Sequence, residues 1–147
     1  MSKISPEVFF SKLHAAPHAA RGFFESISTH FKRKNDICVH HTGTNNGDLR
    51  LAIRGEVLEQ KRIRNFATMY WQSRNRMVFA RTFLTPDELS VFGFDNGTAP
   101  RSASEPLNSD IQLTEAQWRY GVADFIKALE TAKMILAASI IRNHRVT

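Results

Sequence analysis

A single α+β domain over residues 1–147, built on an antiparallel sheet of four or five strands in meander order, is the fold class that the sequence predicts. Three observations lead to it. Two helical patterns open the chain, several runs of alternating apolar and polar residues follow, and a long heptad-like pattern closes it. The chain has 147 residues, which suits one domain and is enough to bury a core without disulfides or a structural metal. Helices are expected to cover at least one face of the sheet.

Two helices are expected before the sheet. The first begins at Ser5 and Pro6, because serine caps helix N-termini and proline suits the first helical position. It ends before Pro17, since the residue ahead of a proline is disfavoured in the helical region. The second helix runs over residues 18–32. Its buried face is expected to consist of Phe23, Phe24, Ile27 and Phe31.

Two strands are expected next, at residues 36–42 and 48–54, and they should form a hairpin with one face exposed to solvent. In the second of these strands Arg50 and Arg54 alternate with apolar residues, which predicts that both arginines lie on the exposed face. Residues 56–60 could add a further short strand.

The centre of the sheet is expected to be a second hairpin, at residues 65–84. This stretch is dense in β-branched and aromatic residues and contains neither glycine nor proline. A two-residue turn at Arg74 and Asn75 sets the pairing of its two strands. One face then pairs Trp71 with Val78, Met69 with Ala80 and Ala67 with Thr82, and the other pairs Tyr70 with Phe79, Thr68 with Arg81 and Phe66 with Phe83.

Both faces of this hairpin are apolar, which leaves two arrangements open. Either helices cover both faces, or one aromatic face is exposed for binding. The general rule that apolar residues at core spacing are buried favours cover. The face with Trp71 and Met69 is expected to be core. The undecided face carries Phe66, Tyr70, Phe79 and Phe83.

Two capping boxes follow the central hairpin. The box at Thr85 predicts a short helix, after which residues 95–112 are expected to be a mobile acidic loop. The box at Thr114 begins a last helix, which is expected to run without a break over residues 115–142. Its end, residues 134–141, is apolar all round and could form a homodimer contact or pack on the N-terminal helices.

The positive charge of the chain is concentrated in the expected sheet. The net charge is +6, with eight basic and two acidic side chains in residues 50–84 and one basic and six acidic side chains in residues 85–115. A basic region attracts nucleic acid, an anionic membrane surface or an acidic ligand, and it is equally explained as a solvated face balanced by the acidic segment.

The number of cysteines and the length of the apolar runs predict the compartment of the protein and whether it contacts a membrane. The only cysteine, Cys38, excludes an internal disulfide and favours a reducing compartment, so a cytoplasmic location is expected. No run of residues approaches the length of a membrane span, so a membrane is not expected as a partner.

The leading functional interpretation is a small non-catalytic binding or interaction module, and its partner could be nucleic acid. Sheet platforms bind single strands with aromatic rings that stack on bases and arginines that contact phosphates. The candidate residues for such a surface are Arg50, Arg54, Arg62, Arg64, Phe66, Tyr70, Arg74, Arg76, Phe79 and Arg81.

An enzyme is the first alternative. Asp48, Glu59 and Lys61 resemble the D…(D/E)xK arrangement of metal-dependent nucleases, in which carboxylates hold Mg²⁺ and the lysine helps polarise the attacking water. A solvated connector of mixed charge explains the same three residues.

The second alternative is a small-molecule pocket between the sheet and the last helix, lined by Trp71, Trp118 and Phe125. No cofactor and no structural metal site are otherwise expected. His40 and His41 are neighbours in a strand and therefore face opposite sides of the sheet.

Overall fold

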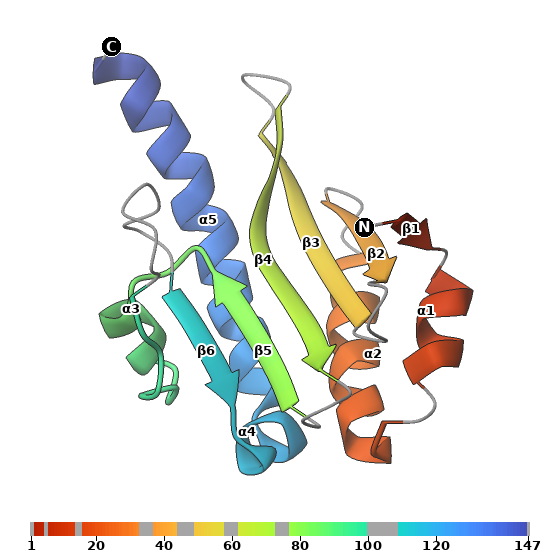
Figure 1. Ribbon diagram of the computed structural model, residues 1–147. Helices are drawn as coiled ribbons and strands as arrows, with labels where there is room; N and C mark the ends of the chain where they lie inside the picture. The colour runs from red at the N-terminus through yellow and green to blue at the C-terminus, as the bar shows by residue number, and fades with distance from the viewer. Residues whose placement is uncertain are drawn as a thin grey trace.

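The computed structural model describes residues 2–4, 6–13, 16–32, 37–43, 49–57, 62–72, 77–99 and 109–146. Two helices follow a first short strand, the strands of the central sheet come next in succession, and the last part of the chain is mostly helical (Figure 1). The elements in order are β1 (Ser2–Ile4), α1 (Pro6–Lys12), α2 (His18–Lys32), β2 (Ile37–Gly43), β3 (Leu49–Val57), β4 (Arg62–Gln72), β5 (Met77–Thr82), α3 (Pro86–Ser90), β6 (Ser109–Leu113), α4 (Glu115–Tyr120) and α5 (Val122–Val146).

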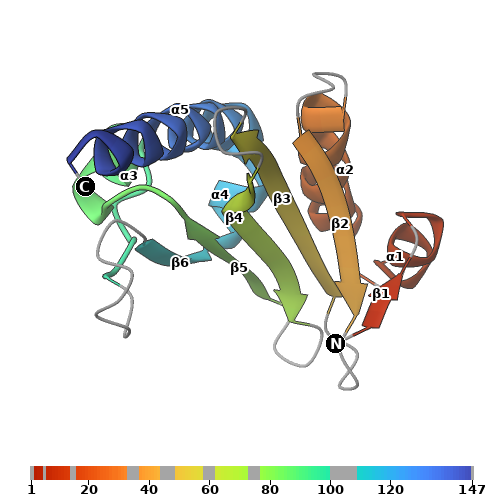
Figure 2. The ribbon, with the colours of Figure 1, turned by 90° about the horizontal axis from the view of Figure 1, so that it is seen from above.

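The strands form one antiparallel sheet in the order β1-β2-β3-β4-β5-β6, so that strands consecutive in the chain are neighbours. Helices α2 and α5 lie across the same face of this sheet (Figure 2). The predicted α+β class with an antiparallel sheet is therefore confirmed. The expected count of four or five strands is wrong, because β1 and β6 join the sheet at its two ends.

Strand β6 (Ser109–Leu113) overlaps the end of the stretch 95–112 that was expected to be a loop. Its burial alternates, with Ser109, Ile111 and Leu113 buried and the residues between them more exposed. One of the three inward positions is a serine, so the apolar alternation that marks a strand is too short to recognise in the sequence. Residues 100–108, the middle of the expected loop, lie outside the described part of the chain.

The central hairpin has the predicted register. Trp71 pairs with Val78, Tyr70 with Phe79, and the remaining pairs follow the same pattern down to Ala67 and Thr82. Met69, Trp71, Val78 and Ala80 are all buried, which confirms that this face is core. The turn predicted at residues 74–75 lies outside the described residues.

A core rich in phenylalanine fills the space between the sheet and the helices. Helix α2 has the bounds expected from the sequence, and its four predicted inward residues are all buried. Phe125 of α5 packs between Phe23 of α2 and Phe94, with ring centroids at 5.5 and 5.2 Å. At the edge of this core, His30 Nε2 donates a hydrogen bond to Glu130 Oε1 at 2.8 Å and ties α2 to α5.

The C-terminal helix is not continuous, contrary to the prediction for residues 115–142. It divides at Gly121, where α4 ends and α5 begins one residue later. The backbone of Gly121 has φ −102° and ψ 13°, and its N–H donates to the carbonyl oxygen of Gln117. A Cβ atom at this position would lie only 2.7 Å from that same oxygen. Glycine is therefore required for the close approach, and it is also the weakest helix former apart from proline.

The outer edge of β6 is occupied by the segment that follows α3. The backbones of Thr98 and Asp110 exchange two hydrogen bonds, at 2.8 and 2.9 Å. Asn96 Nδ2 donates to the carbonyl oxygen of Gln112 at 2.8 Å, and Asn96 and Gln117 exchange side-chain hydrogen bonds at 3.1 and 2.6 Å. Unpaired edge strands invite pairing with another chain. These contacts occupy the outer edge of β6 at Asp110 and Gln112.

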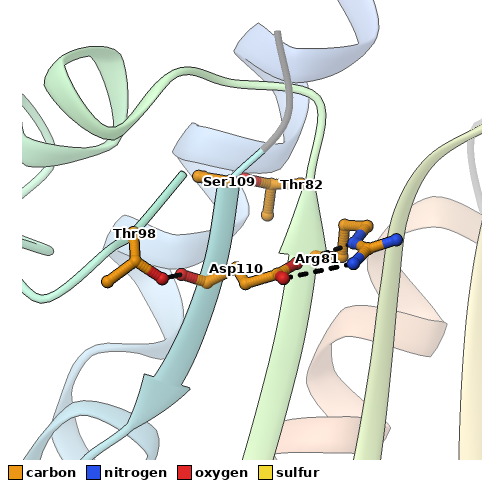
Figure 3. Close-up of polar contacts among 5 residues, drawn as sticks. All are labelled: Arg81, Thr82, Thr98, Ser109 and Asp110. Carbon is orange, nitrogen blue, oxygen red and sulfur yellow. Dashed lines mark hydrogen bonds and ion pairs between the residues drawn. The ribbon is translucent and has the colours of Figure 1, made fainter. Parts of the chain in front are cut away.

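The buried hydroxyl pair Thr82–Ser109 gives a stability prediction. The two oxygen atoms lie 3.1 Å apart, at positions that are 1% and 0% exposed (Figure 3). Thr82→Val should lower the free energy of unfolding by about 1–3 kcal/mol, because it leaves the Ser109 hydroxyl buried without its partner. Adding Ser109→Ala should recover most of this loss, since both polar groups are then gone. Urea unfolding of the two single variants and the double variant measures the effect, and a double variant that loses the sum of both single losses would contradict it.

Candidate functional site: the open face of the sheet

The face of the sheet opposite α2 and α5 is not buried at β4, β5 and β6. Thr68, Tyr70 and Gln72 of β4 are half-buried, and so are Met77 and Phe79 of β5. Neither α2 nor α5 lies over this face (Figure 2). Of the two arrangements left open for the central hairpin, helical cover of both faces is therefore not found in this part of the sheet among the described residues. We call the surface formed by these residues together with Arg81, Asp110 and Gln112 the open face.

Two aromatic rings form the centre of the open face. Tyr70 and Phe79 are direct cross-strand partners, and their ring planes are nearly parallel, with centroids 5.4 Å apart and an interplanar angle of 14°. Cross-strand aromatic pairs stabilise a hairpin, and each ring also has a π-face on which a planar ligand can stack. The predicted pairing of these two residues thus places a stacking surface where solvent can reach it.

An ion pair lies two residues further along the strands, on the same face of the sheet. Arg81 Nε donates to Asp110 Oδ1 at 2.7 Å, and Arg81 Nη2 donates to Asp110 Oδ2 at 3.1 Å (Figure 3). The side chains are 45% and 38% exposed, so solvent screens the attraction and the pair contributes only about 0.2–1 kcal/mol to stability. Two parallel hydrogen bonds nevertheless orient both planar groups. The pair is therefore better suited to presenting polar groups than to holding the fold together.

These side chains enclose a shallow pocket. Its volume is about 430 Å³, and it is lined by Thr68, Tyr70, Phe79, Ala80, Arg81 and Asp110. The aromatic rings form one side and the ion pair forms the other. A volume of roughly 300–1,000 Å³ with apolar walls and a few polar groups is typical of small-ligand sites. Its lining combines the two aromatic rings with the polar side chains of Thr68, Arg81 and Asp110.

The structure brings only part of the predicted nucleic-acid surface into this site. Tyr70, Phe79 and Arg81 line the pocket. In the ladder, Arg50 is the partner of Tyr70, so the backbone of β3 carries an arginine position directly beside the aromatic pair. Arg54 is the partner of Asn65, one position beyond an irregularity in the β3–β4 register.

The other predicted residues lie further away or outside the described chain. Arg62 and Arg64 lie at the start of β4, where they pair with Val57 and Gly55 of β3. Phe66 follows them in β4 and falls at the irregularity in the β3–β4 register. Arg74 and Arg76 lie outside the described residues, as do Asp48, Glu59 and Lys61 of the nuclease hypothesis.

Phe83 does not lie on the open face, although its predicted pairing with Phe66 placed it there. Strand β5 ends at Thr82, and the chain bends at Phe83 toward the capping residue Thr85. Strand alternation no longer applies after that bend, and Phe83 packs half-buried against the core. The aromatic surface is consequently smaller than predicted.

The three residues of the expected pocket between sheet and helix serve a different purpose. Trp71, Trp118 and Phe125 are 4%, 5% and 0% exposed and belong to the packed core. Within the described part of the chain, no group of three or more histidine, cysteine or acidic residues is arranged to hold a metal ion.

Asp110 is the residue of the site that the sequence did not indicate. It lies in the acidic stretch that was interpreted as a loop, and its position is defined by its pairing with Arg81 across β5 and β6 and by its backbone contacts with Thr98. The weak alternation of residues 109–113 was the sole local signal.

The fold and the site together define an α+β domain with one helix-covered face and one aromatic, partly charged open face. Comparisons with protein-family models, with curated proteins and with solved structures find no match to this chain. Among the helices of the described ranges, none combines the length and the apolar character needed to cross a membrane.

Proposed function

We propose that this protein is a non-catalytic binding domain that holds single-stranded nucleic acid on the open face of its sheet. The observation that carries the proposal is the stacked pair Tyr70–Phe79, which is half-buried on the open face of the sheet and lines a pocket of about 430 Å³. Sequence-tolerant binding of single strands relies on such rings, because every base has a π-face that can stack on them.

The charge of the sheet region supports the same partner. Residues 50–84 carry eight basic and two acidic side chains, and this stretch contains β4, β5 and most of β3. Arg50 stands at the ladder position next to Tyr70. Basic groups beside a stacking surface provide the phosphate contacts that supply most of the sequence-independent affinity.

Oligonucleotide binding at two salt concentrations tests the proposal. A labelled single strand of about fifteen nucleotides should bind, since platforms of this kind cover roughly 4–16 nucleotides. With three phosphate contacts, its affinity should fall roughly twentyfold between about 50 and 200 mM salt. The matched control is the duplex of the same sequence, which should bind more weakly because its bases are already stacked. No binding of the single strand at low salt would refute the proposal.

A homodimer through the C-terminal end of α5 is a separate part of the proposal. Met134 of α5 is 70% exposed, and the end of the helix reaches beyond β5 and β6 (Figure 1). Met134 lies midway along α5 and begins the apolar run of residues 134–141, and this run supports contact with a second copy. Light scattering should give the mass of two chains, and the mass of one chain would exclude the dimer. A cytoplasmic location also remains a proposal, based on the single Cys38.

A further inference from the structure

The pocket on the open face has an aromatic side and a charged side. Tyr70 and Phe79 form the aromatic side. Phe79 pairs with Gln112, and Asp110 lies two residues from Gln112 on the same strand, so Asp110 is the diagonal neighbour of Phe79. Such neighbours lie roughly 7–8 Å apart. The sugar attached to a base extends about as far from the centre of that base, so a base stacked on Phe79 places its sugar within reach of Asp110. The inference that follows rests on the proposed function and concerns which kind of nucleic acid the pocket selects.

The Asp110 carboxylate has acceptor sites that its ion pair does not use. Arg81 Nε and Nη2 donate to its two oxygens, one to each, at 2.7 and 3.1 Å (Figure 3). A carboxylate offers about four acceptor sites, so the ion pair leaves each oxygen with a site on its outer side. The side chain is 38% exposed, so a ligand can reach these sites. The edge on which both oxygens face the same way is taken, and a further partner therefore makes one hydrogen bond only.

A sugar hydroxyl suits this single acceptor better than a phosphate or a base edge does. A phosphodiester has no proton to donate at neutral pH. Most base edges place a carbonyl or a ring nitrogen beside an N–H donor, where the carboxylate repels it. A hydroxyl carries one donor that rotates toward its acceptor. Arg81 balances the charge of Asp110, so the phosphate attached to the same sugar meets a neutral pair.

We infer that the pocket selects single-stranded RNA over single-stranded DNA, with the 2′-hydroxyl of the nucleotide stacked on Phe79 donating to Asp110. The 2′-hydroxyl is the group by which a protein distinguishes the two polymers at a given site. Every ribonucleotide carries it, so the contact requires no particular base and agrees with the sequence tolerance of stacking. DNA keeps the stacking and the phosphate contacts and loses this hydrogen bond. A hydrogen bond to a charged group supports a preference of about tenfold.

Fluorescence anisotropy with three strands of one sequence and length tests the preference. The first is an oligouridylate, the second is the oligodeoxyuridylate, and in the third each 2′-hydroxyl of the oligouridylate is replaced by fluorine. Fluorine keeps the ribose-like sugar pucker and has no proton to donate, so it separates the hydrogen bond from the shape of the strand. The wild-type protein should bind the ribose strand about tenfold more tightly than either of the other two. This comparison requires no variant, so folding defects cannot obscure it.

Two variants locate the preference. Asp110→Ala removes the acceptor and should bind the ribose and deoxyribose strands equally. Glu115→Ala is the matched control, because it removes the carboxylate of another exposed ion pair, in which Arg119 Nη2 lies 3.1 Å from Glu115 Oε1 on α4. It changes the net charge by the same amount and should keep the preference.

The outcomes separate the inference from the proposed function. Equal wild-type affinity for the three strands, a fluorine strand that binds like the ribose strand, or a preference kept in Asp110→Ala would overturn the inference and leave the proposed function standing. Loss of the preference in Glu115→Ala would also overturn the inference, because net charge would then be its cause. Failure of all three strands to bind at low salt would overturn both.

Discussion

Phe125→Ala should lower the free energy of unfolding by about 3–5 kcal/mol, the usual cost of truncating a fully buried phenylalanine. Phe125 is 0% exposed and contacts Phe23 of α2 and Phe94 ahead of β6, so it joins three separate parts of the chain. Domains of this size have about 5–15 kcal/mol of stability in total. The variant should therefore melt about 10 °C lower and unfold at a much lower urea concentration.

The chain supplies a control for this substitution. Tyr120→Ala also removes an aromatic ring, five residues earlier, but Tyr120 is 81% exposed. Its effect should stay within about 0.5 kcal/mol, as for most surface positions. Equal losses in the two variants would show that Phe125 does not occupy the core between α2 and the sheet.

Tyr70→Leu combined with Phe79→Leu should reduce affinity for a single-stranded oligonucleotide by about tenfold to a hundredfold. Stacking on one aromatic ring contributes roughly 1–3 kcal/mol per base, and leucine cannot replace it. Leucine keeps apolar bulk on this half-buried face, so the hairpin should remain folded. Anisotropy titrations at a fixed salt concentration measure the loss.

Two controls separate stacking from folding and charge. Tyr120→Leu removes the other tyrosine of the chain and should leave affinity unchanged. The salt dependence of the double variant should match that of the wild type, because no phosphate contact has been removed. A double variant that binds as tightly as the wild type would exclude Tyr70 and Phe79 as the stacking surface.

Local signals in the sequence were sufficient for much of the fold. The register of the central hairpin was predictable because a two-residue turn fixes the pairing, and a slip of one residue would place Val78 on the opposite face from Trp71 and Met69. The capping boxes at Thr85 and Thr114 are both formed as expected, since such boxes depend only on residues three apart.

The features that were missed depend on contacts between distant residues. A serine such as Ser109 is typical of a loop in the sequence. In the fold its side chain points into the core, where its hydroxyl has the Thr82 hydroxyl as a hydrogen-bond partner. Asp110 forms its ion pair with Arg81, which lies on a neighbouring strand. Whether a helix covers Tyr70 and Phe79 is likewise a tertiary property, since the alternation of the strand is the same in either case.

Photo-crosslinking tests most directly whether the open face binds nucleic acid. An oligonucleotide with 5-iodouracil at several positions is irradiated on the protein, and the modified residues are identified by mass spectrometry. The chain has two tyrosines, of which Tyr70 lies in the open face and Tyr120 lies exposed on α4. Crosslinks should form at Tyr70 and Phe79 and not at Tyr120. Crosslinks confined to Tyr120 or to other residues of the helices, or no crosslink and no binding at low salt, would contradict nucleic-acid binding on this face.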